Sequence, residues 1–132
     1  METSTGASRK YDVLIVDDNQ QLAQTLRQLL EGRGFNVATV SNGVLALKHI
    51  LHQPVDVVVC DLKMPQLEGD MFHNTVGRVN PELAKRFVFV TGQAEDPHFQ
   101  KFIAAVNAPV LRKPVSVETL HEAINSLLPK QD

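Results

Sequence analysis

The chain has 132 residues, of which 43% are hydrophobic and 21% are charged, and its formal net charge is -2. This length and balance fit one compact globular domain that needs no disulfide or metal to fold. Lys and Arg are not clustered, so nothing in the charge pattern favours direct nucleic-acid binding. No apolar stretch reaches the ~18 residues of a membrane span.

The two ends of the chain are predicted to lie outside the domain. Residues 1–10 are polar, with nothing to bury, and are expected to form a flexible N-terminal tail. We expect the domain to occupy residues 11–129, followed by a short tail over 130–132. The N-terminus lacks the apolar stretch of a signal peptide, and the single Cys60 is expected to be a core residue in a reducing compartment. These features favour a cytoplasmic protein.

Short apolar runs recur along the chain and predict five buried strands. They are rich in Val, Ile and Phe, as in parallel sheets covered by helices on both faces. The runs are Tyr11–Val16, Phe35–Val40, Val55–Cys60, Phe87–Val90 and Val110–Leu111.

The segments between these runs have the spacing of amphipathic helices. Ser41 or Asn42 is expected to cap the second helix, and the third should end near Pro81. Asp96 followed by Pro97 predicts the start of the fourth helix. Ser116 should cap the last, so five helices alternate with the five strands. The alternation predicts an α/β fold with a parallel sheet between two helical layers.

Polar residues follow four of the predicted strands. Asp17 and Asp18 follow the first, Asp61 the third, Thr91 the fourth and Lys113 the fifth. The carboxyl ends of parallel strands lie at one edge of the sheet, which is where such folds bind ligands. We therefore expect these side chains to meet.

Three carboxylates at one edge repel each other, by about 4 kcal/mol for a pair ~4 Å apart at an effective dielectric of 20. They must either raise carboxyl pKa values or attract a cation. An oxygen-only site with open positions suits Mg²⁺. Thr91 and Lys113 suit a phosphoryl group, and a carboxylate can act as the nucleophile that receives it.

Each of these residues also has an ordinary structural interpretation. Asp17 or Asp18 alone is as readily a helix cap, Lys113 a solvated surface charge and Thr91 a turn residue. Their joint occurrence at four strand ends favours the functional interpretation, because every ordinary explanation would otherwise have to hold independently.

The chain resembles the receiver domains of bacterial two-component response regulators from Tyr11 to Leu128. The matching motifs are V-D-D-N at 16–19, D-L-K-M-P-Q-L-E-G at 61–69, V-T-G at 90–92 and K-P at 113–114. The resemblance implies a flavodoxin-like, doubly wound, five-stranded parallel sheet in the strand order 2-1-3-4-5, flanked by five helices.

The resemblance also implies a role for each site residue. Asp61 would accept the phosphoryl group, and Asp17, Asp18, Asp61 and the backbone carbonyl of Lys63 would bind Mg²⁺. Thr91 would move its hydroxyl onto the phosphoryl group and Lys113 would pair with that group. The Lys113–Pro114 peptide is expected to be cis.

The resemblance further implies partners and a signalling role instead of an enzymatic one. The phosphoryl donor would be a histidine kinase or a His-containing phosphotransfer domain, and the output partner is not identified. A homodimer could form through the fourth helix, the fifth strand and the last helix. The chain is either a stand-alone regulator or a receiver from a larger regulator or hybrid sensor kinase.

Three positions bear on the switch and on the phosphoryl lifetime. Val110 stands where this family commonly has an aromatic residue that rotates inward, so we expect activation to involve shifts of backbone and loops. In this family, the residues at Lys63 and Gln93 tune the access of attacking water. Lys63 is equally well explained as a solvated loop residue.

Other functions remain open but are less well supported by the sequence. An aspartate-based Mg²⁺ phosphatase would need a second Asp where Lys63 stands, and a flavodoxin would need a hydroxyl-rich phosphate loop. A receiver-like docking module that is never phosphorylated is the main alternative. His49 and His52 lack a carboxylate or cysteine partner on their helix and are expected to be solvated.

Overall fold

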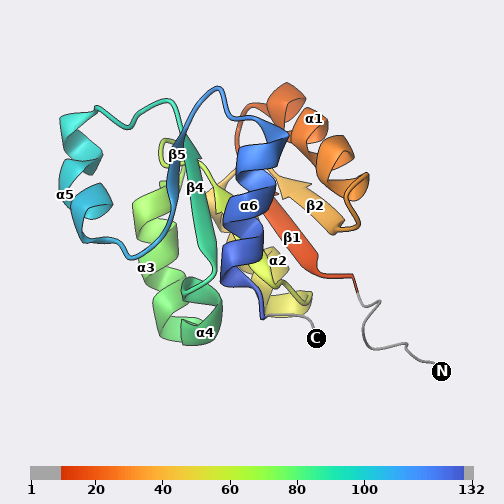
Figure 1. Ribbon diagram of the computed structural model, residues 1–132. Helices are drawn as coiled ribbons and strands as arrows, with labels where there is room; N and C mark the ends of the chain where they lie inside the picture. Colours follow the sequence, from red (N-terminus) through yellow and green to blue (C-terminus); the bar gives the residue numbers. More distant parts are fainter. Residues whose placement is uncertain (1–9, 130–132) are drawn as a thin grey trace.

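The computed structural model describes residues 10–129, which form one parallel sheet in the order β2-β1-β3-β4-β5 with helices on both faces (Figure 1). This confirms the predicted flavodoxin-like α/β fold and its strand order. The elements in chain order are β1 (Asp12–Val16), α1 (Gln20–Glu31), β2 (Asn36–Val40), α2 (Gly43–His52), β3 (Val57–Cys60), α3 (Gly69–Val79), α4 (Pro81–Ala84), β4 (Phe87–Thr91), α5 (Pro97–Ala105), β5 (Val110–Arg112) and α6 (Val117–Leu127).

The parts of the chain predicted to be tails, 1–10 and 130–132, lie outside the described residues except for Lys10. None of the helices described between residues 10 and 129 has the length and apolar character that crossing a membrane would require.

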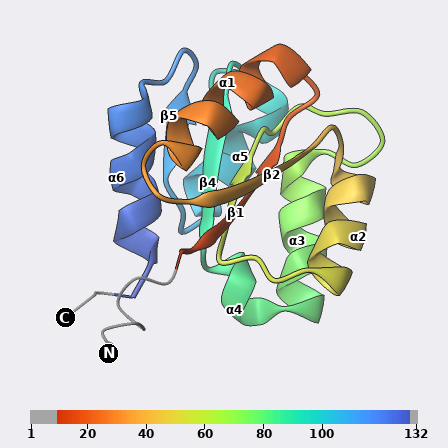
Figure 2. The same ribbon diagram turned by 90° about the vertical axis from the view of Figure 1, so that its right-hand side faces the viewer.

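The sheet separates two apolar clusters. Helices α1 and α6 cover one face, and α2, α3, α4 and α5 cover the other (Figures 1 and 2). Alternate residues of each strand enter alternate clusters, because successive side chains of a strand point to opposite faces. Strand β3 is buried on both sides, which explains its nearly continuous apolar sequence. Cys60 lies at the end of this strand, is fully buried as predicted and forms no disulfide.

Side-chain caps begin helices α1, α2, α5 and α6. Asn19 Oδ1 accepts from the backbone N–H of Leu22, and Asn42 Oδ1 accepts from that of Leu45. Asp96 caps α5 and Ser116 caps α6 in the same way. These bonds satisfy N–H groups that the first helical turn leaves without a partner. Of the two candidate caps for α2, Asn42 is therefore the correct one.

The predicted count of five helices is wrong by one short element, α4. Pro81 ends α3, as expected from its missing N–H, but it also occupies the first position of a new turn over Pro81–Ala84. Asn80 caps this turn by accepting from the N–H of Leu83, whose side chain is fully buried. Proline is compatible with both roles, so its presence alone did not reveal the extra turn.

The loop between β3 and α3 turns back tightly against its own strand. Gly69 donates its N–H to the carbonyl of Leu62 at 2.8 Å. A Cβ on Gly69 would lie 2.3 Å from the carbonyl oxygen of Asp61 and 2.9 Å from Cα of Leu62. Only glycine allows this approach, so Gly69 fixes the loop that follows Asp61.

Replacing Gly69 should therefore destabilise the fold. We expect Gly69→Ala to lower the free energy of unfolding by about 1–3 kcal/mol, because backbone atoms must move to admit the methyl group. Urea denaturation measures the effect. Gly77→Ala is the matched control, since the nearest atom to its Cβ is 4.0 Å away, and it should stabilise α3 by about 0.5–1 kcal/mol. Equal effects of the two changes would contradict this account of Gly69.

Candidate functional site

The register of the sheet places the two buried aspartates side by side. Val16 at the end of β1 pairs with Cys60 at the end of β3. Asp17 and Asp61 are the next residues along their strands, and Asp61 donates its N–H to the carbonyl of Val16 at 3.0 Å. The two acidic side chains therefore lie together, although they are far apart in the sequence.

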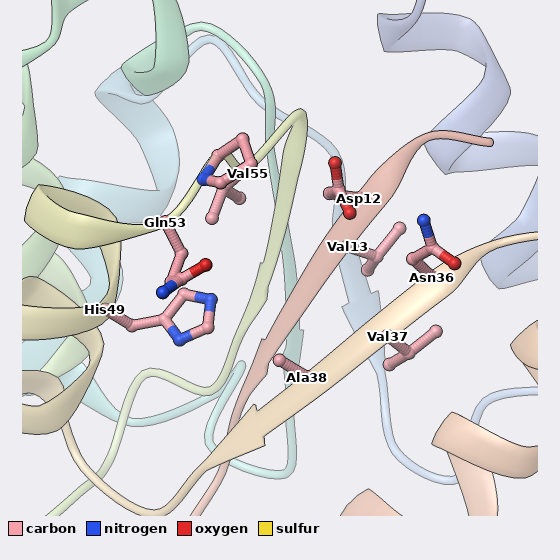
Figure 3. A pocket seen from close by; sticks show the side chains of 9 residues that line it. Asp12, Val13, Asn36, Val37, Ala38, His49, Gln53 and Val55 are labelled. Carbon is pink, nitrogen blue, oxygen red and sulfur yellow. The ribbon is translucent and has the colours of Figure 1, made fainter. Parts of the chain in front are cut away.

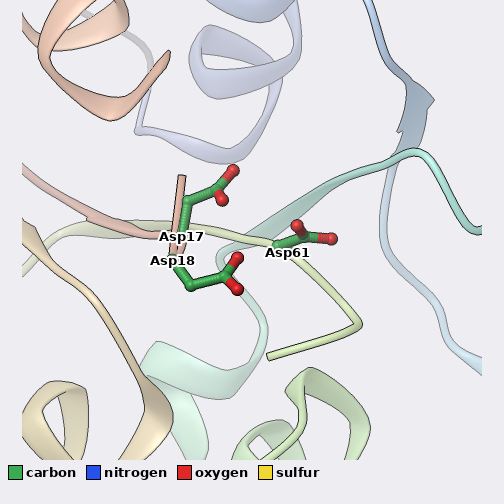
Figure 4. A group of neighbouring side chains, drawn as sticks. All are labelled: Asp17, Asp18 and Asp61. Atoms are coloured by element: carbon green, nitrogen blue, oxygen red, sulfur yellow. The ribbon is translucent and has the colours of Figure 1, made fainter. Parts of the chain in front are cut away.

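Asp18 completes a group of three carboxylates (Figure 4). One ligand atom from each of Asp17, Asp18 and Asp61 lies within 4.8 Å of the others. Asp17 and Asp61 are 4% and 7% exposed, whereas Asp18 is open to solvent. Among residues 10–129, this is the only group of three or more His, Cys, Asp and Glu side chains placed closely enough to share a metal ion.

Lys113 links the two buried carboxylates. Its ammonium Nζ lies 2.9 Å from Oδ2 of Asp17 and 2.9 Å from Oδ2 of Asp61. The Lys113–Pro114 peptide is cis, as predicted. The backbone N–H of Lys113 donates to the carbonyl of Thr91, so β4 anchors the start of the loop that presents the ammonium.

Burial and charge act in opposite directions on these groups. Burial raises the pKa of Asp61, and the nearby charge of Asp17 adds to this, while the hydrogen bond and charge of Lys113 lower it without cancelling the rise. For Lys113, burial alone would lower the pKa, but its hydrogen bonds to Asp17 and Asp61 outweigh that effect and raise it. The ion pairs therefore keep Lys113 charged, whereas Asp61 remains a costly buried anion.

Thr91 lies at the end of β4 with no exposed surface. Its Oγ1 accepts a hydrogen bond from the backbone N–H of Gln93 at 2.9 Å. The hydroxyl can therefore still donate its own proton to another acceptor.

An open pocket of about 420 Å³ joins these groups to solvent. Lys63 and Gln93 both line it, so the structure brings the two predicted tuning positions to the same opening as Asp61. The residues that line it are Asp18, Asn19, Asp61, Lys63, Gly92, Gln93 and Lys113. Every site residue predicted from the sequence thus lies in this pocket or among the groups directly beside it.

Sequence reasoning missed two backbone contacts that hold the carboxylates. The N–H of Leu62 donates to Oδ1 of Asp61 at 2.7 Å, and the N–H of Asn19 donates to Oδ1 of Asp17 at 2.9 Å. Asn19 also caps α1 through its side chain, and that side chain does not indicate the contact of its backbone N–H with Asp17. The contact of Leu62 could not be predicted from the sequence, because almost any residue type offers the same backbone N–H.

Removing the buried charge of Asp61 should stabilise the fold at neutral pH. The pKa of Asp61 is higher in the folded protein than the ordinary value of 3.8, so the folded state binds the proton more tightly. The free energy of unfolding of the unmodified protein therefore rises as the pH falls from the folded-state pKa towards 3.8. We expect Asp61→Asn to raise the urea midpoint at neutral pH, with a gain that shrinks on acidification. Urea titrations at several pH values measure this gain.

The exposed Asp18 provides the control for this comparison. Asp18→Asn should change the midpoint much less, because water already solvates that carboxylate. A lower midpoint for Asp61→Asn than for the parent at neutral pH would mean that the ion pair with Lys113 outweighs the cost of burial.

Most of the chain matches a known protein family. The model of the response regulator receiver domain matches residues 13–125. The sensor kinase CckA of Brucella abortus is 31% identical over all of this chain, and the transcriptional regulatory protein ZraR of Escherichia coli is 35% identical over 54% of it. The chain spans only 14% and 16% of the length of these two relatives.

Solved structures show the same fold. The chemotaxis response regulator CheY4 of Vibrio cholerae is 27% identical, with a TM-score of 0.76, and the match covers 91% of this chain and 100% of that one. A CheY-like receiver domain protein from Methanospirillum hungatei has a TM-score of 0.80 at 24% identity, covering 89% and 93%. The chain therefore belongs to the family of response regulator receiver domains of two-component systems.

Proposed function

We propose that residues 11–129 form the phosphoacceptor receiver domain of a two-component phosphorelay, in which Asp61 takes a phosphoryl group from a histidine kinase or a His-phosphotransfer domain. The observation that carries the proposal is the meeting of Asp61 with an ammonium and two further carboxylates at the ends of three different strands. An aspartate that only capped a helix, or a lysine that only lay in a solvated loop, would need none of these neighbours.

The contacts of Asp61 are suited to nucleophilic attack. Leu62 N–H holds Oδ1 and Lys113 holds Oδ2, so the carboxylate is fixed in orientation at the floor of the open pocket. A carboxylate oxygen would form a bond to phosphorus as the bond from phosphorus to the donor imidazole nitrogen breaks, and the imidazole would leave neutral after taking up a proton. Lys113 would then pair with a phosphoryl oxygen.

The donor set fits Mg²⁺. Three carboxylates face one ammonium, so the site has an excess of negative charge, and its available ligands are all oxygen atoms. Asp17, Asp18, Asp61 and the backbone carbonyl of Lys63 would hold the ion, which when bound would offset the repulsion between Asp61 and the incoming phosphoryl oxygens.

The switch would operate through Thr91. Its hydroxyl would donate to a phosphoryl oxygen, and the segment that follows β4 would move with it. Val110 is partly buried beside the α5 face of the sheet and has no ring to rotate. Backbone and loop shifts within 91–112 would therefore carry the change to the surface of α5, β5 and α6, which is the proposed homodimer face.

The wider setting is also part of the proposal. The protein would work in the cytoplasm, without direct contact to nucleic acid or membrane, and would signal instead of turning over a substrate. Its output would be a partner protein or an attached domain, since the chain matches only small parts of two longer relatives.

Phosphorylation can be tested by intact mass measurement after incubation with acetyl phosphate and Mg²⁺. We expect one phosphoryl group per chain, none with Asp61→Asn, and none when EDTA replaces Mg²⁺. Asp70→Asn, which removes a carboxylate from the first turn of α3, should leave the addition intact.

Two outcomes separate the proposal from its main alternative. No addition to the parent chain under any condition would favour a docking module that is not phosphorylated. If addition occurs, backbone NMR spectra of both forms should differ within residues 91–112, and identical spectra there would rule out the proposed route through Thr91.

The lifetime of the phosphoryl group should depend on the two rim residues. We expect Lys63→Ala and Gln93→Ala to change the dephosphorylation rate by about two- to tenfold, up to ~1.4 kcal/mol in the barrier, because both side chains border the path of the attacking water. Loss of phosphorylated mass with time measures the rate. Glu82→Gln on α4 should leave it unchanged, and unchanged half-lives in both rim variants would refute the role.

A further inference from the structure

A second pocket lies at the opposite edge of the sheet from Asp61 (Figure 3). A helix that connects parallel strands runs back along the sheet, so the C-terminal end of α2 lies over the starts of β1 and β2. The pocket between them has a volume of about 210 Å³. Its lining residues are Asp12, Val13, Asn36, Val37, Ala38, His49, Gln53, Pro54 and Val55.

Two pairs of polar side chains face each other across this pocket. Asp12 and Asn36 are register partners at the starts of β1 and β2, so their side chains emerge side by side on one face of the sheet. His49 and Gln53 are four residues apart at the end of α2, which places them on one face of the helix (Figure 3). The sheet thus supplies a carboxylate and an amide, and the helix an imidazole and an amide.

These four side chains are not used by the fold. Within residues 10–129, none of them makes a hydrogen bond to another protein group through its side-chain atoms, although each carries at least one acceptor. The backbone N–H of Asp12 donates to Asp56, which leaves the Asp12 carboxylate itself available. Asn36 and Gln53 each offer a carbonyl oxygen as well.

The local field favours a cation. The end of α2 that lines the pocket carries the negative end of the helix dipole. The carboxylate of Asp12 lines the pocket. Among residues 10–129, no Lys or Arg lines the pocket beside this carboxylate.

We propose that this pocket binds a guanidinium group carried on an aliphatic stem. A planar guanidinium can donate two parallel hydrogen bonds to Asp12 and further bonds to the amide oxygens of Asn36 and Gln53. The stem would lie against the apolar wall formed by Ala38, Pro54 and Val55.

The size of the pocket supports a small ligand. Drug-sized ligands occupy roughly 300–1,000 Å³, more than this pocket offers, whereas one alkyl guanidinium is much smaller. The group could come from a free molecule or from an arginine side chain of a partner protein. The proposal does not rest on phosphorylation, since none of these residues lines the Asp61 pocket.

Backbone NMR spectra of the ¹⁵N-labelled chain can test the proposal. The probes are agmatine, which is a free alkyl guanidinium, and N-acetyl-arginine methylamide, which presents the same group on a peptide backbone. We expect saturable shifts in residues 12, 36–38 and 49–55. Tighter binding of agmatine would assign a free molecule as the source, and tighter binding of N-acetyl-arginine methylamide would assign an arginine side chain.

Two variants make the test specific. Asp12→Asn should weaken binding about tenfold, because it removes the charged partner of the guanidinium. Gln53→Leu keeps the volume but removes an acceptor, and should weaken binding less. Asp61→Asn should leave these shifts unchanged. No saturable shift with either probe, or shifts confined to residues 17–18 and 61, would overturn the proposal.

Discussion

The candidate site depends on one contact, in which the ammonium of Lys113 binds the buried carboxylates of Asp17 and Asp61. Without Lys113, Asp17 and Asp61 would face each other in a poorly hydrated site with no positive charge beside them. The lysine comes from the far end of the sequence, so the contact also ties the loop after β5 to the ends of β1 and β3. The same atoms that hold this edge together are those from which a phosphoryl transfer site would be built.

The architecture was predictable because several signals agreed. Apolar runs gave the strands, alternation gave the parallel sheet, and Asn42, Asp96 and Ser116 marked helix starts where the structure has them. The short helix α4 was missed, since Pro81 both ends one helix and begins the next. Strand order followed from resemblance to a family, because periodicity alone does not say which strands are neighbours.

The candidate site was predictable as a set of side chains but not as a set of contacts. Asp17, Asp61 and Lys113 could be placed at one edge, because parallel strands end together. That Lys113 bridges both aspartates, and that backbone N–H groups hold their remaining oxygens, depends on loop geometry within fractions of an ångström. The pocket at Asp12 and His49 gave no sequence signal, because its residues match no motif and meet through the register of β1 and β2 and the packing of α2.

If Thr91 acts as the proposed switch, its hydrogen bond with Gln93 would set an energetic threshold for switching. If the hydroxyl turned towards Asp61, the N–H of Gln93 would lose its acceptor and would have to find another or remain unsatisfied, at a cost of about 1–3 kcal/mol. The turned state would then hold only about one molecule in six to one in 160. The level of signalling without phosphorylation would then depend on the hydrogen bond of the Gln93 backbone. Substitutions that give the N–H of Gln93 another acceptor would raise this basal level without changing the residues that accept the phosphoryl group.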